Sequence, residues 1–520
     1  MHSSKHFVII TLLILLSLAT AIARTASEWR SRTIYQLLTD RFAQSPGQKN
    51  PQLCANNGNE YEIRRYCGGT FTGVIDKLDY IKDMGFDAIW ISPVVKQFEK
   101  ETKYGPGWHG YWAQDIYEIN SHFGTANELK QLVQEAHARN IWVMVDVVAN
   151  HMGPQEGTTP YTAEYLKAYT PFNKTEHFHD FCVIEHWGND YEVEHCSLGG
   201  YDLPLPDLNT ENPQVVDIFS NWISDLVREY NFDGIRIDTV KHVRREFWSE
   251  FTAAAGVFSI GEMFHDDPYT VGNYQNYMDS VLGYPLFEKI IPVFTNPFSD
   301  MGSVSRAVQS MRGAFKDVTV LGNFIDNHDQ PRFLSRTQDR NLLKNALTFV
   351  LLTDGIPIIY QGTEQGFNGG NDPWNREALW PSNYSQSSDL YQFIATINKF
   401  RQTLPSSYFT SLSIEAWAND RIYAFFKDRA LVVMTIYGTY DPMFSIKVKT
   451  NGLYSVGTTL VNILNCTEKV TVDSYGEVGV RITGDPRIFY PSQEVKGLCQ
   501  IDKRRMNRKV DRQINIFKFA

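Results

Sequence analysis

The stretch Phe232-Asp-Gly-Ile-Arg-Ile-Asp238 is a short apolar run that ends in an acid. Side chains alternate along a β-strand, so Arg236 and Asp238 share one face and Ile235 and Ile237 share the other. Runs of this length that are largely apolar are typical of strands in a parallel sheet that is covered on both faces. Similar runs recur at residues 34–38, 88–91, 143–148, 259–263, 321–325 and 356–360.

Helical patterns separate these apolar runs, for example at residues 128–138 and 213–230. Strands that alternate with helices imply a parallel sheet with crossover connections. More than six such units favour a closed barrel over an open sheet. The predicted class is therefore α/β, with a (β/α)8 barrel of the TIM type.

Two intervals depart from this alternation. Residues 152–208 are rich in Gly, Pro, Asn, His and Tyr and are too long for a connecting loop, so they predict a small domain inserted after the third strand. Short β-type runs beyond residue 405 predict a C-terminal antiparallel β-sandwich over 406–500. The barrel then comprises 28–151 and 209–405. Residues 501–520 hold seven Lys or Arg against two Asp and predict a basic tail.

The composition is that of a folded globular protein, with 43% hydrophobic and 21% charged residues. The formal net charge of −10 argues against a nucleic-acid partner, because such binding normally needs a basic surface. A neutral substrate such as a sugar needs no basic surface. We expect a monomer.

The N-terminus has the features of a secretory signal peptide. Lys5 and His6 precede an apolar run over residues 7–18, and Ala21-Ile-Ala23 offers a cleavage site. The alternative is a membrane anchor, but the run is shorter than the roughly 20 residues that a spanning helix needs. We therefore predict a signal peptide over 1–23 and a protein that is secreted or luminal, without stable membrane insertion.

In an oxidising compartment the even number of cysteines favours disulfides. Six cysteines allow 15 connectivities, and pairing of sequence neighbours is the simplest of them. A metal cluster is the alternative, but no C-x-x-C spacing occurs. The cysteines are Cys54, Cys67, Cys182, Cys196, Cys466 and Cys499, and possible glycan sites start at Asn173, Asn383 and Asn465.

Three apolar runs end in acids that are suited to glycoside hydrolysis: Asp238, Glu262 and Asp329. The active site of a barrel lies at the carboxyl ends of its strands. Arg236 should keep Asp238 ionised, and apolar neighbours should keep Glu262 protonated. Cleavage of a glycosidic bond needs this division between one carboxylate and one carboxylic acid.

Each acid has a structural alternative when it is taken singly. An Asp at a strand end is often the N-cap of the following helix, and Asp146 is a candidate for that role. Three acids at three strand ends, one with an arginine on its own face and one beside Asn327-His328, favour a catalytic site.

Several segments resemble the signature regions of the α-amylase family of glycoside hydrolases, most closely its secreted fungal-type members. The resemblance covers about residues 31–499. It rests on residues 146–151 (DVVANH), 205–209 (LPDLN), 234–242 (GIRIDTVKH), 261–263 (GEM) and 324–329 (FIDNHD), which follow the family's order, and on 32–42 and 369–377.

The resemblance implies a nucleophile at Asp238, a general acid/base at Glu262 and a third acid at Asp329 that holds sugar hydroxyls. It also implies a set of substrate contacts, to which we add Arg236. The other members of this set are Tyr111, Trp112, His151, Lys241, His328, Asp372 and Arg376.

The resemblance further implies a Ca²⁺ ion between the barrel and the insert, with the oxygens of Asn150, Glu194, Asp207 and the His242 carbonyl as ligands. These are the oxygen donors that a hard cation prefers, although such acids also serve as caps. It implies the disulfides Cys54–Cys67, Cys182–Cys196 and Cys466–Cys499. The other histidines of the insert, His177, His179, His186 and His195, receive no role.

We thus expect a retaining endo-hydrolase of α-1,4-glucans such as starch and glycogen. Within the same family, an α-glucosidase or a transglycosylase is the alternative. From another class, the alternative is a non-catalytic carbohydrate-binding protein, which should lack part of the acid set. The sequence departs from fungal relatives at Met263, Phe264 and His265, which follow the predicted acid/base.

Overall fold

The computed structural model describes residues 24–48, 54, 59–155, 162–495 and 497–499. The predicted signal peptide and basic tail lie outside these residues. Within the described ranges no helix has both the length and the apolar character that a membrane crossing requires.

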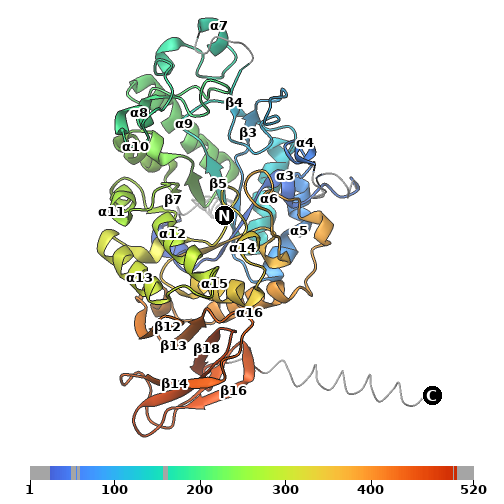
Figure 1. Ribbon diagram of the computed structural model, residues 1–520. Coiled ribbons are helices and arrows are strands. Elements are labelled where there is room, and N and C mark those ends of the chain that lie inside the picture. Colours follow the sequence, from blue (N-terminus) through green and yellow to red (C-terminus); the bar gives the residue numbers. More distant parts are fainter. Residues whose placement is uncertain (1–23, 49–53, 55–58, 156–161, 496, 500–520) are drawn as a thin grey trace, which may run out of the picture.

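Eight parallel strands form the predicted barrel (Figure 1). Their order in the sheet is β8-β7-β6-β5-β2-β1-β10-β9. A parallel bridge between Leu282 and Gly322 joins the two ends of the sheet, so the ring closes. The strands are β1 (Ile34–Leu37), β2 (Ala88–Ile91), β5 (Trp142–Val147), β6 (Gly234–Ile237), β7 (Phe258–Gly261), β8 (Ser280–Val281), β9 (Gly322–Asn323) and β10 (Ile356–Tyr360).

Helices connect successive strands and cover the outside of the ring, which confirms the (β/α)8 class. The main ones are α5 (Phe71–Asp83), α6 (Ala126–Ala138), α9 (Pro213–Tyr230), α10 (Arg245–Ala255), α12 (Tyr284–Phe294), α13 (Gly302–Ala314), α15 (Arg340–Leu352) and α16 (Asp389–Arg401). A short antiparallel pair, β3 (Val95–Gln97) and β4 (Ala113–Ile119), interrupts the connection after β2.

Helix α9 shows how local sequence sets these bounds. The Asn212 side chain accepts a hydrogen bond from the Gln214 backbone N–H, and Pro213 occupies the first helical position, where its missing N–H costs nothing. The helix ends at Asn231, whose left-handed φ of 57° asparagine tolerates well. Its apolar stripe, which includes Phe219, is buried against the barrel.

The insert after β5 contains little regular structure among its described residues. Its helices are α7 (Ala163–Leu166), the 3₁₀ helix η1 (Thr175–His177) and α8 (Asp190–His195). Antiparallel bridges join His151 to Asp207 and Phe178 to Leu208, so the end of the insert pairs with the chain that leaves β5. The loops at the carboxyl end of the barrel and the insert therefore share one face of the molecule.

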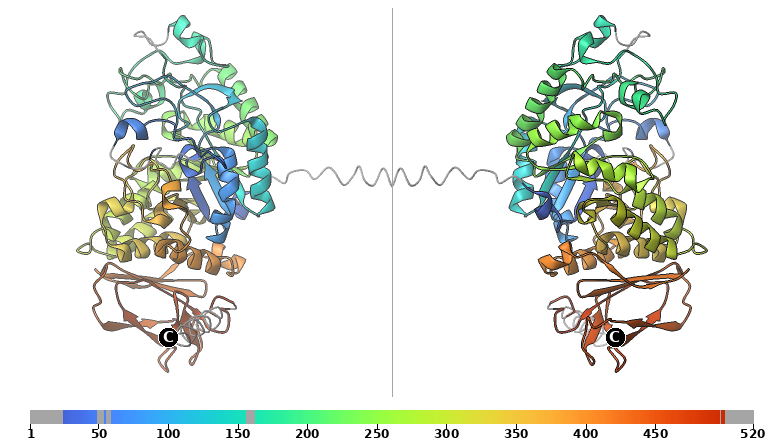
Figure 2. Two further views of the ribbon diagram at one scale, coloured as in Figure 1. Left: turned by 90° about the vertical axis from the view of Figure 1, so that its right-hand side faces the viewer. Right: turned by 90° about the vertical axis from the view of Figure 1, so that its left-hand side faces the viewer.

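The C-terminal region forms antiparallel sheets over a core of their own, as predicted. One sheet has the order β11-β12-β13-β18-β15-β16, and β14 pairs with β17. Figures 1 and 2 show these sheets at the end of the molecule opposite the insert. The strands are β11 (Ile414–Ala418), β12 (Ile422–Lys427), β13 (Ala430–Thr435), β14 (Phe444–Lys449), β15 (Thr459–Asn462), β16 (Asn465–Thr471), β17 (Glu477–Ile482) and β18 (Arg487–Pro491).

Candidate active site

The register of the barrel brings two of the predicted acids together. Strands β6 and β7 are parallel neighbours, and Ile237 pairs with Gly261. The next residues in the two strands, Asp238 and Glu262, therefore lie side by side at the carboxyl end of the sheet. A Cβ at Gly261 would lie 2.4 Å from the Met278 sulfur, so a larger residue there would have to displace the Met278 side chain.

One buried guanidinium links these acids. Arg236 is fully buried, and its Nη1 donates to Asp238 Oδ1 at 2.8 Å and to Asp146 Oδ1 at 2.9 Å. Its Nη2 forms an ion pair with Glu262 Oε2 at 2.8 Å. Asp146 lies on β5 directly opposite Arg236. The alternative that Asp146 caps a helix is therefore wrong, because its carboxylate anchors this arginine.

The electrostatics differ from the prediction. Burial raises the pKa of Asp238 well above its usual range, with the Glu262 and Asp146 charges adding to this and Arg236 opposing it. Burial likewise raises the pKa of Asp146 to about 6, against the pull of Arg236. The expectation that only apolar groups surround Glu262 is wrong, because Arg236 touches it. A single cation thus serves three carboxyls, which favours retention of a proton within the set.

The backbone after Asp238 is also shaped around Glu262. Thr239 has φ 48° and ψ 41°, a left-handed conformation that is unusual for a β-branched residue. In this conformation its backbone N–H donates to Glu262 Oε2 at 3.2 Å. Strained backbone of this kind is characteristic of functional sites.

The third predicted acid, Asp329, sits among charged partners. Arg376 Nη2 donates to Asp329 Oδ1 at 3.1 Å, and His328 Nε2 lies 3.2 Å from Asp329 Oδ2. Arg376 also pairs with Asp372 through Nη1 and Oδ1 at 3.1 Å. Four of the predicted site residues thus form one continuous cluster.

A chain of hydrogen bonds ties this cluster to Arg236. The Gln36 amide lies 2.8 Å from His328 Nδ1, and His328 Nε2 lies 2.7 Å from the Tyr111 hydroxyl. The Tyr111 hydroxyl in turn donates to Asp146 Oδ2 at 2.8 Å. The Tyr111 and His328 rings stack at 5.4 Å. When His328 is neutral, each donor in this series of hydrogen bonds faces an acceptor.

Sequence reasoning missed Tyr284. Its hydroxyl donates to Glu262 Oε1 at 3.3 Å and accepts from Asn327 Nδ2 at 3.1 Å. Tyr284 follows β8, a strand of two residues that has no apolar run of its own in the sequence. The only sequence signal is positional, because a polar group after a sixth strand should face the same centre.

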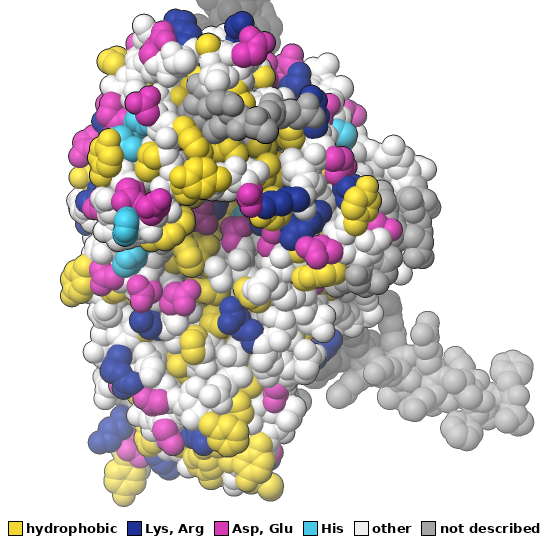
Figure 3. All heavy atoms as spheres, turned by 45° about the horizontal axis from the view of Figure 1, so that its top comes forward, with side chains coloured by type: hydrophobic (Ala, Val, Ile, Leu, Met, Phe, Trp, Pro, Cys, Tyr) yellow, Lys and Arg dark blue, Asp and Glu magenta, His cyan; other side chains and the backbone are white. Residues whose placement is uncertain are grey.

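These groups open onto a cleft of about 560 Å³. Figure 3 shows the corresponding hollow, with acidic side chains inside it and hydrophobic side chains around it. Trp187 from the insert and Phe264 after β7 are more than half exposed. The lining residues are Trp187, Leu198, Thr239, Lys241, His242, Glu262, Phe264, Tyr284, Asp329 and Gln330.

Sequence profiles match both parts of the chain. The profile of the α-amylase catalytic domain matches residues 36–389, and that of the α-amylase domain C matches residues 416–507. This chain belongs to the α-amylase family.

Individual family members match over nearly the whole chain. An α-amylase of Saccharomycopsis fibuligera is 42% identical over 478 residues, which cover 91% of this chain and 94% of that protein. Alpha-amylase 2 of Schwanniomyces occidentalis is 43% identical over 495 residues, which cover 94% and 95%. The solved structure of an α-amylase from Malbranchea cinnamomea superposes with a TM-score of 0.86 at 40% identity, covering 92% of this chain and 100% of that one.

Two of the predicted substrate contacts, Trp112 and His151, are buried. The Trp112 backbone N–H donates to Gln97 Oε1 at 2.6 Å, and the Trp112 ring contacts His109 edge-on. His151 is buried behind the Tyr111 backbone. The His151 ring contacts the Tyr111 carbonyl oxygen, and a direct contact of Trp112 or His151 with sugar stays a prediction.

Three oxygens of the predicted calcium ligands converge where the insert meets the barrel. The Asn150 amide oxygen lies 2.7 Å from the His242 carbonyl oxygen and 3.2 Å from Asp207 Oδ1. An exchange of the amide N and O would turn these contacts into hydrogen bonds, so the orientation of Asn150 has to be decided from its other partner.

His151 decides that orientation. Its Nε2 lies 3.0 Å from the Tyr111 carbonyl oxygen, so a neutral ring carries its proton there and Nδ1 accepts. The donor to Nδ1 is the Asn150 NH₂ at 3.1 Å. The Asn150 oxygen must then face Asp207 and the His242 carbonyl. Oxygens that converge without a proton between them fit a hard cation such as Ca²⁺.

Glu194 lies on α8 beside this group. The carbonyl oxygen of the preceding residue, Val193, accepts a hydrogen bond from His242 Nδ1 at 3.1 Å. Glu194 is half-buried, and burial raises its pKa. Its membership of the ligand set stays a prediction.

The cysteines form the three pairs that the resemblance implies, Cys54–Cys67, Cys182–Cys196 and Cys466–Cys499. The asparagines of the three sequons, Asn173, Asn383 and Asn465, are all exposed.

Proposed function

We propose that this chain is a secreted α-amylase that cuts internal α-1,4 bonds of starch or glycogen with retention of the anomeric configuration. One observation carries the proposal: Asp238 and Glu262 lie on register-matched strand ends and share the Arg236 guanidinium. Retaining glycosidases hold their two carboxyls only about 5–5.5 Å apart, whereas inverting enzymes separate them by about 6.5–9.5 Å. A shared guanidinium supports the closer arrangement.

In the proposed reaction Asp238 attacks the anomeric carbon while Glu262 protonates the leaving glycosidic oxygen. Water then enters, and Glu262 takes its proton as the general base. Glu262 suits this exchange because it lines the cleft. Asp329 and its partners His328 and Arg376 hold sugar hydroxyls at the cleavage point.

The rim of the cleft supports a polymeric sugar as substrate. Aromatic faces pack against the C–H surfaces of sugars, and Trp187 and Phe264 expose such faces beside Glu262. Lys241 lines the same side. We assign these three residues to the sugar units beyond the cut bond, and Asp372 with Arg376 to the opposite side.

A calcium ion held by Asn150, Asp207 and the His242 carbonyl, with Glu194, is part of the proposal. Its support is the convergence of oxygens at 2.7 and 3.2 Å. The ion supplies no reaction step. It neutralises Asp207 and ties the insert, which carries Trp187, to the loop that follows Asp238.

Secretion is supported by the predicted signal peptide over 1–23 and by three disulfides, which persist in oxidising compartments.

The Glu262→Gln variant tests the acid/base role. Loss of a general acid typically costs about 10²–10⁴ in rate, so kcat on soluble starch should fall by that factor while KM changes little. Glu250→Gln, an exposed acid on α10, is the matched control and should retain full activity. Starch hydrolysis at the wild-type rate by Glu262→Gln contradicts the assignment.

The anomer that is released first and the mixture of products distinguish the proposed α-amylase from the alternative functions. NMR of the first product should show the α anomer, and release of the β anomer excludes a retaining mechanism. Chromatography after brief digestion of long starch should show mixed oligosaccharides. Glucose alone indicates an α-glucosidase, cyclic or lengthened chains indicate a transglycosylase, and no products at all indicate a non-catalytic binding protein.

A further inference from the structure

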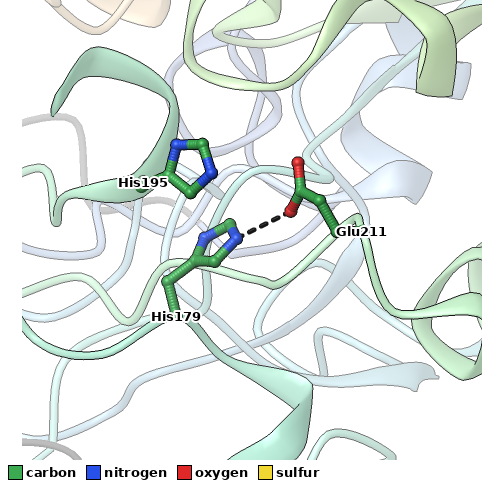
Figure 4. Close-up of side chains that lie close together, drawn as sticks. All are labelled: His179, His195 and Glu211. Atoms are coloured by element: carbon green, nitrogen blue, oxygen red, sulfur yellow. Dashed lines mark hydrogen bonds and ion pairs between the residues drawn. The ribbon is translucent and has the colours of Figure 1, made fainter. Parts of the chain in front are cut away.

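Two histidines of the insert, His179 and His195, meet the acid Glu211 just before α9 (Figure 4). His179 Nε2 lies 2.7 Å from Glu211 Oε2, and the two imidazole rings are 4.5 Å apart between centroids. One ligand atom from each of the three side chains falls within 4.8 Å of the others. The cluster lies outside the active-site cleft, and the proposed reaction does not use it.

The hydrogen bonds of the rings point their remaining nitrogens at this cluster. His179 Nδ1 lies 2.7 Å from Asp207 Oδ2, and His195 Nδ1 lies 3.0 Å from the Tyr191 carbonyl oxygen. Both acceptors keep a proton on Nδ1. The Nε2 lone pairs are then free for a metal, which in His179 would replace the proton that the contact with Glu211 otherwise needs. Histidines that bind metals almost always donate their other N–H to a carboxylate or a carbonyl in this way.

The fold also holds the ligands in place. His195 is the last residue of α8 and stacks on Tyr191 at 4.2 Å. The Cys182–Cys196 disulfide ties the segment after His179 to the residue after His195. The Glu211 N–H donates to Asn209 Oδ1 at 3.1 Å. Three separate segments of the chain are thus fixed around one point.

We propose that His179 Nε2, His195 Nε2 and the Glu211 carboxylate bind a divalent transition-metal ion of the zinc type. Two imidazoles and one carboxylate match zinc and leave a fourth position for water. The same set is a poor match for Ca²⁺, which takes six to eight oxygens. Glu211 is exposed and both histidines are only partly buried, so an ion can enter from solvent.

Asp207 connects this site to the proposed calcium site. Its Oδ1 faces Asn150, and its Oδ2 holds His179 Nδ1 at 2.7 Å. A metal on His179 Nε2 therefore fixes the ring that orients a calcium ligand. The insert would then be held to the barrel by two ions that share one carboxylate.

An ion-pair network is the competing explanation. A protonated His179 can bridge Asp207 and Glu211 without any metal, and Arg244 Nε also lies 3.8 Å from Glu211 Oε1. That network does not require the His195 Nε2 as a ligand. Removal of His195 therefore separates the two explanations.

The experiment is calorimetric titration of the full-length protein, saturated with CaCl₂, with ZnCl₂. Wild type should bind one equivalent of zinc, and His195→Ala and Glu211→Gln should each bind at least about tenfold more weakly. His186→Ala is the matched control, because His186 is an exposed insert histidine paired with Glu192, and it should bind like wild type.

Starch hydrolysis and the circular dichroism spectrum, both recorded without zinc, verify that each variant is folded. Two outcomes overturn the proposal. The first is no zinc binding to calcium-loaded wild type, and if zinc then binds only to calcium-free protein, it occupies Asn150 and Asp207 instead. The second is equal zinc affinity of wild type and His195→Ala.

Discussion

The Asp146→Asn substitution should destabilise the protein and at the same time extend its activity to lower pH. Asp146 is buried, and its carboxylate accepts from Arg236 at 2.9 and 3.1 Å, from the Trp90 indole at 3.0 Å and from the Tyr111 hydroxyl at 2.8 Å. All of these partners are donors. An asparagine offers one oxygen and one NH₂, so in either orientation a donor faces a donor.

The size of the stability loss follows from these contacts. A hydrogen bond to a charged group contributes about 1.5–3 kcal/mol. Breaking a buried ion pair by removing one partner costs about 3–5 kcal/mol. Arg236 keeps two other carboxyls, Asp238 and Glu262, so we expect the lower end, about 3 kcal/mol. Denaturant unfolding followed by tryptophan fluorescence measures this difference.

The effect on activity has a definite sign. The Asp146 charge raises the pKa of Asp238, and Arg236 opposes the rise. Without the Asp146 charge, the Asp238 carboxylate is easier to ionise, so its pKa falls. If Asp238 acts as an ionised nucleophile, the acid limb of kcat/KM must move to lower pH.

Asp354→Asn is the matched control for this prediction. Asp354 is also buried and pairs with Arg312 at 2.6 Å and Lys427 at 3.1 Å, far from the barrel's carboxyl end. It should lose stability without any shift of the acid limb. An acid limb in Asp146→Asn that stays in place or moves to higher pH refutes the reasoning about Asp238.

Three further predictions concern the metal, a disulfide and pH. Excess EGTA should lower the midpoint of thermal unfolding, because a free ion concentration of 1,000 times the Kd adds about 4 kcal/mol to the free energy of unfolding. An unchanged midpoint counts against calcium at Asn150. Cys466→Ser with Cys499→Ser opens a loop with a sequence separation of 33 and should cost about 3–4 kcal/mol of unfolding free energy; an equally stable variant contradicts this. Burial holds the pKa of His109 well below its usual range, and its Nδ1 accepts the Tyr111 N–H. Below about pH 6.5 the unfolded chain takes up this proton and the folded chain does not, so acidification costs stability. The stability gap between wild type and His109→Gln should therefore narrow from pH 7 to pH 5, and a widening gap refutes the sign.

Features with a local sequence signal were predicted well. The bounds of α9 follow from Asn212, Pro213 and an apolar periodicity, and the structure confirms residues 213–230. The strand-end positions of Asp238 and Glu262 follow from short apolar runs, and the register confirms that these acids are neighbours.

Features set by tertiary contacts could not be predicted. Strand β8 has only two residues, and its neighbours hold it in the ring. It therefore needs no long apolar run that could reveal it in the sequence, and Tyr284, which follows it, was missed. The surroundings of Glu262 were predicted wrongly, because its sequence neighbours are apolar whereas Arg236, which contacts it, lies on the adjacent strand β6. The His179 and His195 cluster joins segments that a disulfide and a helix end bring together.

Arg236 pairs with both Asp238 and Glu262, so a difference between polar and apolar surroundings cannot by itself give these two acids different roles. If Asp146, Asp238 and Glu262 were all ionised, three negative charges would face one guanidinium in a buried site. Burial raises the pKa of Asp146 and of Asp238, so the set favours keeping one proton. Glu262 is the member that lines the cleft, and the Tyr284 hydroxyl and the Thr239 N–H hold its two oxygens in place. In the proposed reaction, the place of Glu262 on the cleft wall suits it to act as the general acid, with Asp238 as the nucleophile.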